Sequence, residues 1–287
     1  MPCIRPKSDE TRSGNKASTE PSIRQRILTE LEAIEARHQV RVLFACESGS
    51  RAWGFASPDS DYDVRFLYVH QPEWYFRVEP QRDVIELPIS DELDISGWEL
   101  RKALQLLRRS NPTLLEWLDS PIVYRRDEAV IDKLRTLAPV FFSRRKGRWH
   151  YLAMARKNFR DYLQGDTVRL KKYLYVLRPL LAARWIDSGR GMPPMRFATM
   201  AEALINDNAL RDEINALLRV KMASGEAAHG DRFTLIHAFI EAELAKAEHD
   251  TDPKKPAGDE HLLDQMLFQV VHQTASAPAR VEQTPPQ

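Results

Sequence analysis

The sequence has 287 residues, of which 43% are hydrophobic and 29% are charged. This composition excludes collagen-like and wholly disordered chains and can supply the core of one or two domains. No apolar run approaches the roughly 18 residues of a membrane span, and the N-terminus lacks the apolar region of a signal peptide, so we expect a cytoplasmic protein without membrane contacts. Cys3 and Cys46 make neither a disulfide framework nor a zinc site, so a bound metal would need oxygen ligands.

Charge is balanced over the whole chain but not along it. The formal net charge is +1, from 42 Lys and Arg against 41 Asp and Glu. Between Ser143 and Arg178, eleven Lys and Arg stand against Asp161 and Asp166, so this basic segment carries +9 and the remainder carries −8. Such a separation predicts a side that faces a polyanion, although cations on outer helix faces are also ordinary solvated surface.

In chain order, residues 1–20 are polar and are predicted to form a disordered arm. An amphipathic period predicts a helix over Ile23–Arg37, and a short helix is expected at Arg51–Phe55. Apolar runs rich in β-branched and aromatic residues predict strands at Val40–Cys46, Asp63–His70, Val84–Ile89 and Leu93–Ile95.

After Gly97 the periodicity becomes helical, beginning with a stripe from Leu100 to Leu107 that stops at Pro112. The same period predicts helices over Thr113–Leu118, Glu128–Leu137, Ser143–Leu163, Val168–Ile186, Met195–Asn206, Leu210–Met222 and Phe233–His249. We therefore expect an α+β fold, with a small α/β domain built on a mixed sheet and an all-helical domain after it. The predicted boundaries are 21–125 for the α/β domain, 126–248 for the helical domain, 249–260 for a linker, 261–273 for a C-terminal helix and 274–287 for a disordered tail.

The segment Glu47–Tyr68 carries the most specific pattern. Gly49 and Ser50 follow a predicted strand and precede the short helix, so a tight turn there can aim backbone N–H groups and a hydroxyl at a phosphate. Asp61 and Asp63 lie two residues apart, so in an extended chain their carboxylates project from one face and can share divalent cations. A phosphate cradle beside a metal-binding pair is what two-metal nucleotidyl transfer needs.

A third carboxylate is expected from a neighbouring strand, and the candidates are Glu86, Asp91 and Asp94. We favour Asp94, because it lies between Leu93 and Ile95 and would face away from these apolar side chains on an extended segment. Its task would be that of a general base toward an attacking hydroxyl, or of a ligand of the second metal. The choice over Glu86 stays open.

Each of these signals has a plainer interpretation when it is taken alone. A Gly-Ser turn is usually only a turn, and Asp61 and Asp63 could belong to a capped loop or a structural Ca²⁺ site, although the glycine and distal glutamate of an EF-hand are missing. Arg51 could reach a triphosphate or pair with Glu47 or Asp59. The catalytic interpretation is favoured because the Gly-Ser turn and the Asp-x-Asp pair occur together at a fixed spacing and are flanked by two predicted strands.

The basic segment also contains aromatic residues, a composition suited to stacking and phosphate contact with RNA. Most of these rings follow helical spacing, which favours the core as their place. Lys171, Lys172 and Arg178 are the candidates for contact with nucleotide or RNA phosphates.

Gly49-Ser50, the Asp61-Tyr62-Asp63 triplet eleven residues on and a later strand aspartate together resemble the signature of the DNA polymerase β nucleotidyltransferase superfamily. More narrowly, GSRAWGFASPDSDYDVRFLY and KKYLYVLRPLLAARW are similar to predicted nucleotidyltransferases of bacteria and phages that are placed in RNA repair pathways. The resemblance covers roughly residues 40–250 and implies three roles. Gly49 and Ser50 would bind the nucleotide phosphates, Asp61 and Asp63 would bind the metal, and Asp94 would be the third carboxylate.

We therefore predict a nucleotidyltransferase that uses Mg²⁺ or Mn²⁺ to move an NMP from an NTP, with ATP expected first, to an acceptor hydroxyl. RNA is the first-choice acceptor, in end repair or modification. One alternative keeps the chemistry and changes the acceptor to a protein, as in AMPylation, or to a small molecule. Another is a regulator that binds nucleotide or RNA without catalysis, which has no need of three carboxylates.

Overall fold

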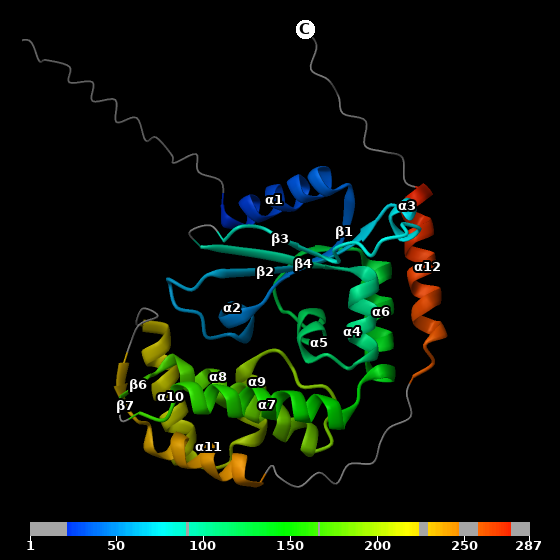
Figure 1. Ribbon diagram of the computed structural model, residues 1–287. Coiled ribbons are helices and arrows are strands. Elements are labelled where there is room, and N and C mark those ends of the chain that lie inside the picture. Colours follow the sequence, from blue (N-terminus) through cyan, green and yellow to red (C-terminus); the bar gives the residue numbers. More distant parts are fainter. Residues whose placement is uncertain (1–21, 90–91, 166, 224–228, 247–257, 277–287) are drawn as a thin grey trace, which may run out of the picture.

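The computed structural model describes residues 22–89, 92–165, 167–223, 229–246 and 258–276, which form a mixed sheet with helices packed around and below it (Figure 1). The helices are α1 Ile23–His38, α2 Gly49–Trp53, α3 Pro72–Tyr75, α4 Leu100–Arg108, α5 Pro112–Leu118, α6 Glu128–Phe141, α7 Arg144–Tyr162, α8 Lys171–Asp187, α9 Phe197–Leu204, α10 Asn208–Ala223, α11 Thr234–Lys246 and α12 His261–Ser276. The strands are β1 Val40–Glu47, β2 Tyr62–His70, β3 Val84–Glu86, β4 Leu93–Glu99, β5 Val123–Arg126, β6 Thr167–Arg169 and β7 His229–Asp231.

In the described part of the chain, the main sheet has five strands in the order β3-β4-β2-β1-β5. β1 pairs antiparallel with β2 and β5, β3 pairs antiparallel with β4, and β2 pairs parallel with β4. Phe66 lies opposite Gly97 in the parallel pair, and a Cβ on Gly97 would approach the Phe66 ring to 2.3 Å. This close fit of a ring over a glycine fixes the register, since a shift by one residue would turn every side chain to the other face.

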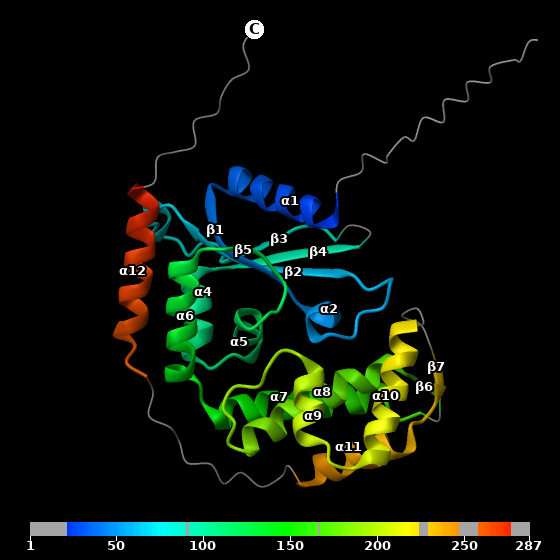
Figure 2. The same ribbon diagram turned by 180° about the vertical axis from the view of Figure 1, so that it is seen from behind.

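The sheet is covered on both faces. α1 lies across one face, where Ile27, Leu31 and Ile34 pack on a cluster that includes Val64 and Ile95. On the other face, α2, α4, α5 and α6 lie between the sheet and the helices from α7 to α11 (Figure 2). One apolar cluster continues from the sheet through these helices, and α12 returns to pack against β2, α3 and α4.

The α+β class predicted from the sequence is confirmed, and most predicted elements are present with shifted ends. α2 begins at Gly49 rather than at Arg51, because Gly49 adopts a φ of 58° and turns the chain into the helix at once. β4 continues to Glu99, beyond the predicted end at Ile95, whereas β3 already ends at Glu86. The predicted division between residues 125 and 126 stays a prediction, since the apolar cluster is continuous across it.

Sequence periodicity missed α3, β5, β6 and β7. The helix predicted over Val168–Ile186 was wrong at its beginning, because Thr167–Arg169 forms β6 and pairs with β7 before α8 begins. Strands of three or four residues are too short to show an alternating pattern, so their partners decide them.

α12 extends to Ser276, beyond the predicted end of the C-terminal helix at residue 273. The predicted arm at 1–20, most of the predicted linker and the rest of the tail lie outside the described residues. Among the described residues, no helix is both long and apolar enough to cross a membrane.

A buried ion pair joins the helices below the sheet. Arg178 on α8 is only 3% exposed, and its Nη1 donates to Glu116 Oε1 on α5 at 3.0 Å. The same carboxylate oxygen accepts from the Tyr151 hydroxyl on α7 at 2.8 Å. The guanidinium also lies over the ring of Trp53 on α2, 4.5 Å from its centroid. Four elements thus converge on one charge pair.

We expect Arg178→Met to destabilise the protein by about 3–5 kcal/mol, because it leaves the Glu116 carboxylate buried without its cation. Urea unfolding at pH 7 measures this change. The matched control is Arg184→Met on the same helix, whose guanidinium is 34% exposed and lies 3.5 Å from Glu243, and it should cost no more than about 1 kcal/mol. Equal losses in the two variants would contradict the assigned role of the pair.

Candidate active site

The turn after β1 brings the backbone of Gly49 against the carboxylate of Asp63. Gly49 has a φ of 58°, and a Cβ at this position would lie 1.9 Å from Asp63 Oδ2. The amide of Ser48 donates to the carbonyl of Asp63 at 2.8 Å, which ties the turn to the start of β2. Ser50 is buried in the first turn of α2, where its carbonyl accepts from the amides of Gly54 and Phe55. The predicted phosphate turn and one predicted metal ligand are therefore in direct contact.

Asp63 and Asp94 are neighbours across the parallel strands β2 and β4. They are Cα partners in the register, and their side chains are each about one-third exposed. The guanidinium of Arg65, two residues after Asp63 on the same face, bridges them: Nη2 lies 3.1 Å from Asp63 Oδ1 and 2.7 Å from Asp94 Oδ2. A single cation thus compensates two carboxylates that would otherwise repel each other.

The register also separates the candidates for the third carboxylate. Asp94 stands beside Asp63, whereas Glu86 is on β3, one strand farther out, and pairs with Arg82 at 2.6 Å. Asp91 lies outside the described residues. The geometry favours Asp94, as the sequence did.

Glu47 lies beneath the pair and is fully buried at the end of β1. Its Oε1 accepts from the backbone N–H of Asp63 at 2.8 Å, and its Oε2 accepts from the hydroxyl of Tyr124. Burial raises the pKa of the Glu47 carboxyl above its ordinary value, while these two donors oppose the shift. Glu47 therefore positions the backbone of Asp63, a role that sequence reasoning did not assign. The sequence feature that could have indicated this role is an acidic residue at the end of a buried apolar strand.

The loop that leads to Asp61 is held from two sides. Arg51 on α2 donates to the carbonyls of Ser60 at 2.6 Å and Asp61 at 3.1 Å, and its guanidinium lies 3.6 Å from the ring centroid of Tyr62. Arg51 therefore holds this loop, and its contact with a triphosphate stays a prediction.

From the helical side, the buried ammonium of Lys221 on α10 donates to the hydroxyls of Ser57 at 2.5 Å and Ser60 at 3.4 Å. Sequence reasoning did not find Lys221, since a lysine on a helix is normally solvated and only the tertiary fold brings it to this loop. The loop that precedes the carboxylates is thus fixed by α2 and by the helical layer together.

The structure does not gather all three predicted metal ligands. Asp61 is exposed just before β2, and among the described residues no group of three or more His, Cys, Asp or Glu side chains could hold a metal ion. Asp63 and Asp94 alone form a pair of hard oxygen donors of the kind that Mg²⁺ prefers. Their chemistry fits a divalent cation, which would take the place between them that Arg65 now neutralises. The metal-binding role of Asp61 stays a prediction.

The three predicted cations of the basic segment lie in different surroundings. The ammonium of Lys172 lies over the rings of Tyr162 and Tyr175, at 3.9 and 4.9 Å from their centroids. Tyr175 in turn makes an edge contact with Trp53 on α2, 5.7 Å between centroids, so Lys172 is placed on the side of α8 that approaches the phosphate turn. Lys171 precedes it and is half-buried. Arg178 is buried against Glu116 instead, so we do not include it in the nucleotide site.

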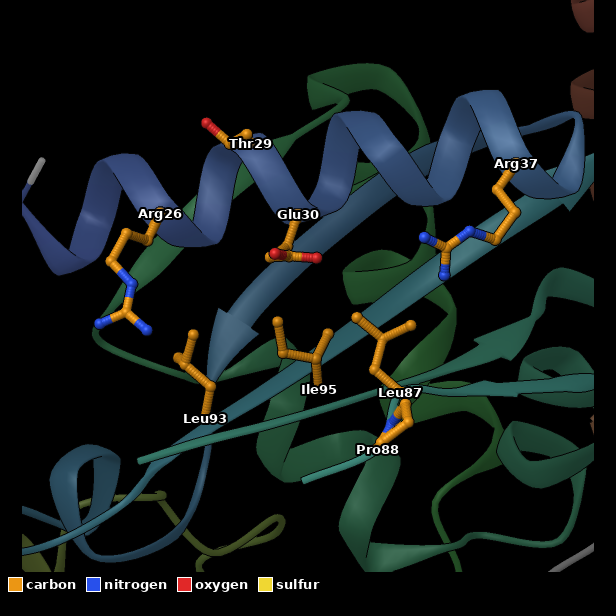
Figure 3. Close-up of a pocket in the computed structure, with 8 residues that line it drawn as sticks. All are labelled: Arg26, Thr29, Glu30, Arg37, Leu87, Pro88, Leu93 and Ile95. Carbon is orange, nitrogen blue, oxygen red and sulfur yellow. The ribbon is translucent and has the colours of Figure 1, made fainter. Parts of the chain in front are cut away.

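The opposite face of the sheet contains a cavity of about 390 Å³ between α1 and the strands β3 and β4. Figure 3 shows Leu93 and Ile95 directed toward α1, below Arg26 and Arg37. Because Leu93 and Ile95 face α1, Asp94 between them faces the other side, toward Asp63. This cavity is therefore separated from the carboxylates by the sheet.

Comparisons with known proteins identify the family of this chain. The model of the RNA repair pathway DNA polymerase beta family, RlaP, matches residues 23–269. A Bacillus subtilis (strain 168) protein, named only as the uncharacterized protein YcgL, is 50% identical over 224 residues, which are 78% of this chain and 86% of that protein. The crystal structure of a nucleotidyltransferase-like protein from Exiguobacterium sibiricum 255-15 is 15% identical and covers 87% of this chain and 80% of its own, with a TM-score of 0.29. The family assignment comes from the match to the family model.

We expect Gly49→Ala to destabilise the protein by about 1–2 kcal/mol for the positive φ and by roughly 1–3 kcal/mol more because its Cβ displaces the Asp63 carboxylate. Gly191→Ala is the matched control. Its φ is 81°, yet a Cβ there meets nothing within 4 Å, so it should show only the first cost. Urea unfolding of the two variants separates the cost of the positive φ from the cost of displacing Asp63. Equal losses of stability in the two variants would mean that Asp63 does not lie against the turn.

We expect Arg65→Met to lower stability by about 1–3 kcal/mol, because two half-buried carboxylates lose their shared cation. Added Mg²⁺ should then raise the melting temperature of the variant more than that of the wild type, since the ion no longer competes with a guanidinium. Arg82→Met, which breaks an exposed pair with Glu86, should change neither quantity. A Mg²⁺ response that is the same in all three proteins would contradict a cation site at the pair.

Proposed function

This chain belongs to the RNA repair pathway DNA polymerase beta family, and from that membership we propose that it transfers an NMP from an NTP to a hydroxyl of RNA. Nucleotidyl transfer in general is what the family supports. The Mg²⁺ dependence, ATP as the preferred NTP and RNA as the acceptor are our proposals.

The observation that carries the proposal is the contact between the Gly49 turn and the Asp63–Asp94 pair. A nucleotidyltransferase must hold the charged triphosphate and place its α-phosphate beside carboxylates that bind divalent cations. Here the glycine turn and Asp63 touch, and Asp94 lies one strand away in register. Three short pieces of chain would thus supply both halves of such a site.

The residues divide the work as follows. Backbone N–H groups of the turn at Gly49 and Ser50 would bind the β- and γ-phosphates, and Lys171 and Lys172 at the start of α8 would add positive charge. Asp61, Asp63 and Asp94 would hold Mg²⁺, and the bound ion would neutralise charge on the triphosphate.

In the transfer step, the acceptor hydroxyl oxygen would form a bond to the α-phosphorus while the bond to pyrophosphate breaks. Asp94 would accept the hydroxyl proton. Glu47 and Arg51 would act indirectly, by holding the backbone of Asp63 and of the loop at Asp61.

Two features support RNA as the acceptor. The basic segment from Ser143 to Arg178 carries +9 and is built largely into α7 and α8, and Tyr175 on α8 contacts Trp53 on α2. A polyanion gains from such a surface through counterion release. The description of the family points to the same substrate class.

The transfer assay combines the full chain, Mg²⁺, each α-labelled NTP in turn and RNAs with defined 3′ ends. We expect Asp63→Asn and Asp94→Asn to reduce transfer at least about a hundredfold, since each removes roughly 3 kcal/mol of charge stabilisation. Glu86→Gln is the matched control, because Glu86 was the rival third carboxylate, and it should retain activity.

The position of the label decides between acceptors. If RNA is labelled and the labelling requires Asp63 and Asp94, the proposal is supported. If a protein or a small hydroxyl compound is labelled instead, that molecule is the acceptor and RNA is not. NTP binding without transfer to any acceptor would overturn catalysis and favour a nucleotide-binding regulator. A large loss in Glu86→Gln with activity retained in Asp94→Asn would exchange the roles of these two residues.

A further inference from the structure

A second cavity lies on the same side of the sheet as the carboxylates but at the far end of α4. Its volume is about 750 Å³, and it lies between the turn from α4 to α5 and the first turns of α7. Figure 1 and Figure 2 both place α2 and α4 at opposite ends of the sheet. Asp94 is at the start of β4, whereas the cavity lies beyond the end of α4, the helix that follows this strand.

The lining of this α7 pocket is cationic. Arg109, Arg145 and Lys146 line it, and no Asp or Glu is among the described residues that do so. Ser143 caps α7, its hydroxyl accepting from the backbone N–H of Lys146, so the positive end of a 19-residue helix adds to the field of the side chains. An anion is the ligand that this charge distribution selects.

Two flat rings accompany the cations. Trp149 lines the pocket and is 38% exposed, an unusual exposure for a side chain that usually gains most from burial. His150 lies next to it in the lining of the pocket. Cations beside an accessible indole are the combination that binds a phosphate together with a neighbouring base.

We propose that the α7 pocket binds an internal nucleotide of the acceptor RNA, with Arg145 and Lys146 on the backbone phosphate and Trp149 stacked on the base. This inference deepens the proposed function and rests on RNA being the acceptor. The pocket lies beyond the end of α4, apart from the Gly49 turn. On a strand of RNA, the reacting end would lie at the carboxylates while an upstream nucleotide occupies the pocket.

The test measures binding of the full chain to a fluorescent single-stranded RNA of about 20 nucleotides, without NTP, over a series of salt concentrations. We expect Lys146→Glu to weaken binding about tenfold and to reduce the slope of log Kd against log salt by roughly one. Trp149→Ala should weaken binding by a similar factor while leaving the slope unchanged, because stacking releases no counterions. The control is Lys157→Glu, the same charge reversal at an exposed position of α7 outside the pocket.

Equal affinity of Lys146→Glu and Lys157→Glu would overturn the proposal. So would displacement of the labelled RNA by free AMP as effectively as by unlabelled RNA, since the pocket would then take a mononucleotide. Thermal melting shows whether each variant is folded, and if Trp149→Ala is not, Lys146→Glu alone decides, because its side chain is exposed.

Failure of the proposed function gives a different result from failure of the pocket. If RNA is not the acceptor, the wild type transfers no label to RNA whatever its affinity. If only the pocket is wrong, label reaches RNA and the pocket variants transfer it as efficiently as Lys157→Glu does. If the pocket binds an upstream nucleotide of a long RNA, Lys146→Glu should transfer to a dinucleotide acceptor as well as the wild type does.

Discussion

The parallel pairing of β2 with β4 is the constraint on which the site depends. It places Asp63 beside Asp94, at the same end of two strands that are 31 residues apart in the chain, and nothing in local sequence could bring them together. Two adjacent carboxylates repel each other unless a cation lies between them, and Arg65 is that cation in this structure. The same pairing seats Phe66 over Gly97, so one register serves both the packing of the sheet and the chemistry at its edge.

Around this pair, buried polar groups hold the backbone in position, although burying them does not favour stability. Glu47 is fully buried, and burial raises the pKa of its carboxyl, yet it holds the amide of Asp63 and the hydroxyl of Tyr124. Lys221 is also buried, with its ammonium on two serine hydroxyls of the loop before Asp61. Burying a charge is unfavourable unless it is well hydrogen-bonded, so such groups are expected where geometry matters more than free energy of unfolding.

The helical layer is bound to the sheet layer by charge as well as by apolar packing. Arg178 and Glu116 join α8 to α5, and Lys221 joins α10 to the loop at Ser57. These contacts fix where α7 and α8 present their cations. Lys172 is brought toward α2 through Tyr175 and Trp53, whereas the α7 pocket lies at the first turns of α7, beyond the end of α4. The basic segment therefore divides into a part near the phosphate turn and a part that suits a longer polyanion.

The sequence by itself determined the class of fold, most of the helices and strands, and the conjunction of Gly49-Ser50 with Asp61 and Asp63, because periodicity and short-range spacing are local properties. It also indicated Asp94, from alternation with Leu93 and Ile95. Only the tertiary structure decided that Asp94 rather than Glu86 stands beside Asp63, that Arg65 bridges the two, and that Glu47 and Lys221 hold the loop. It also took Arg178 out of the nucleotide site, since a basic residue on a helix looks the same in sequence whether it meets solvent or a buried glutamate. Strand register and helix docking bring together residues that are far apart in the chain, so these contacts cannot be predicted from local sequence patterns.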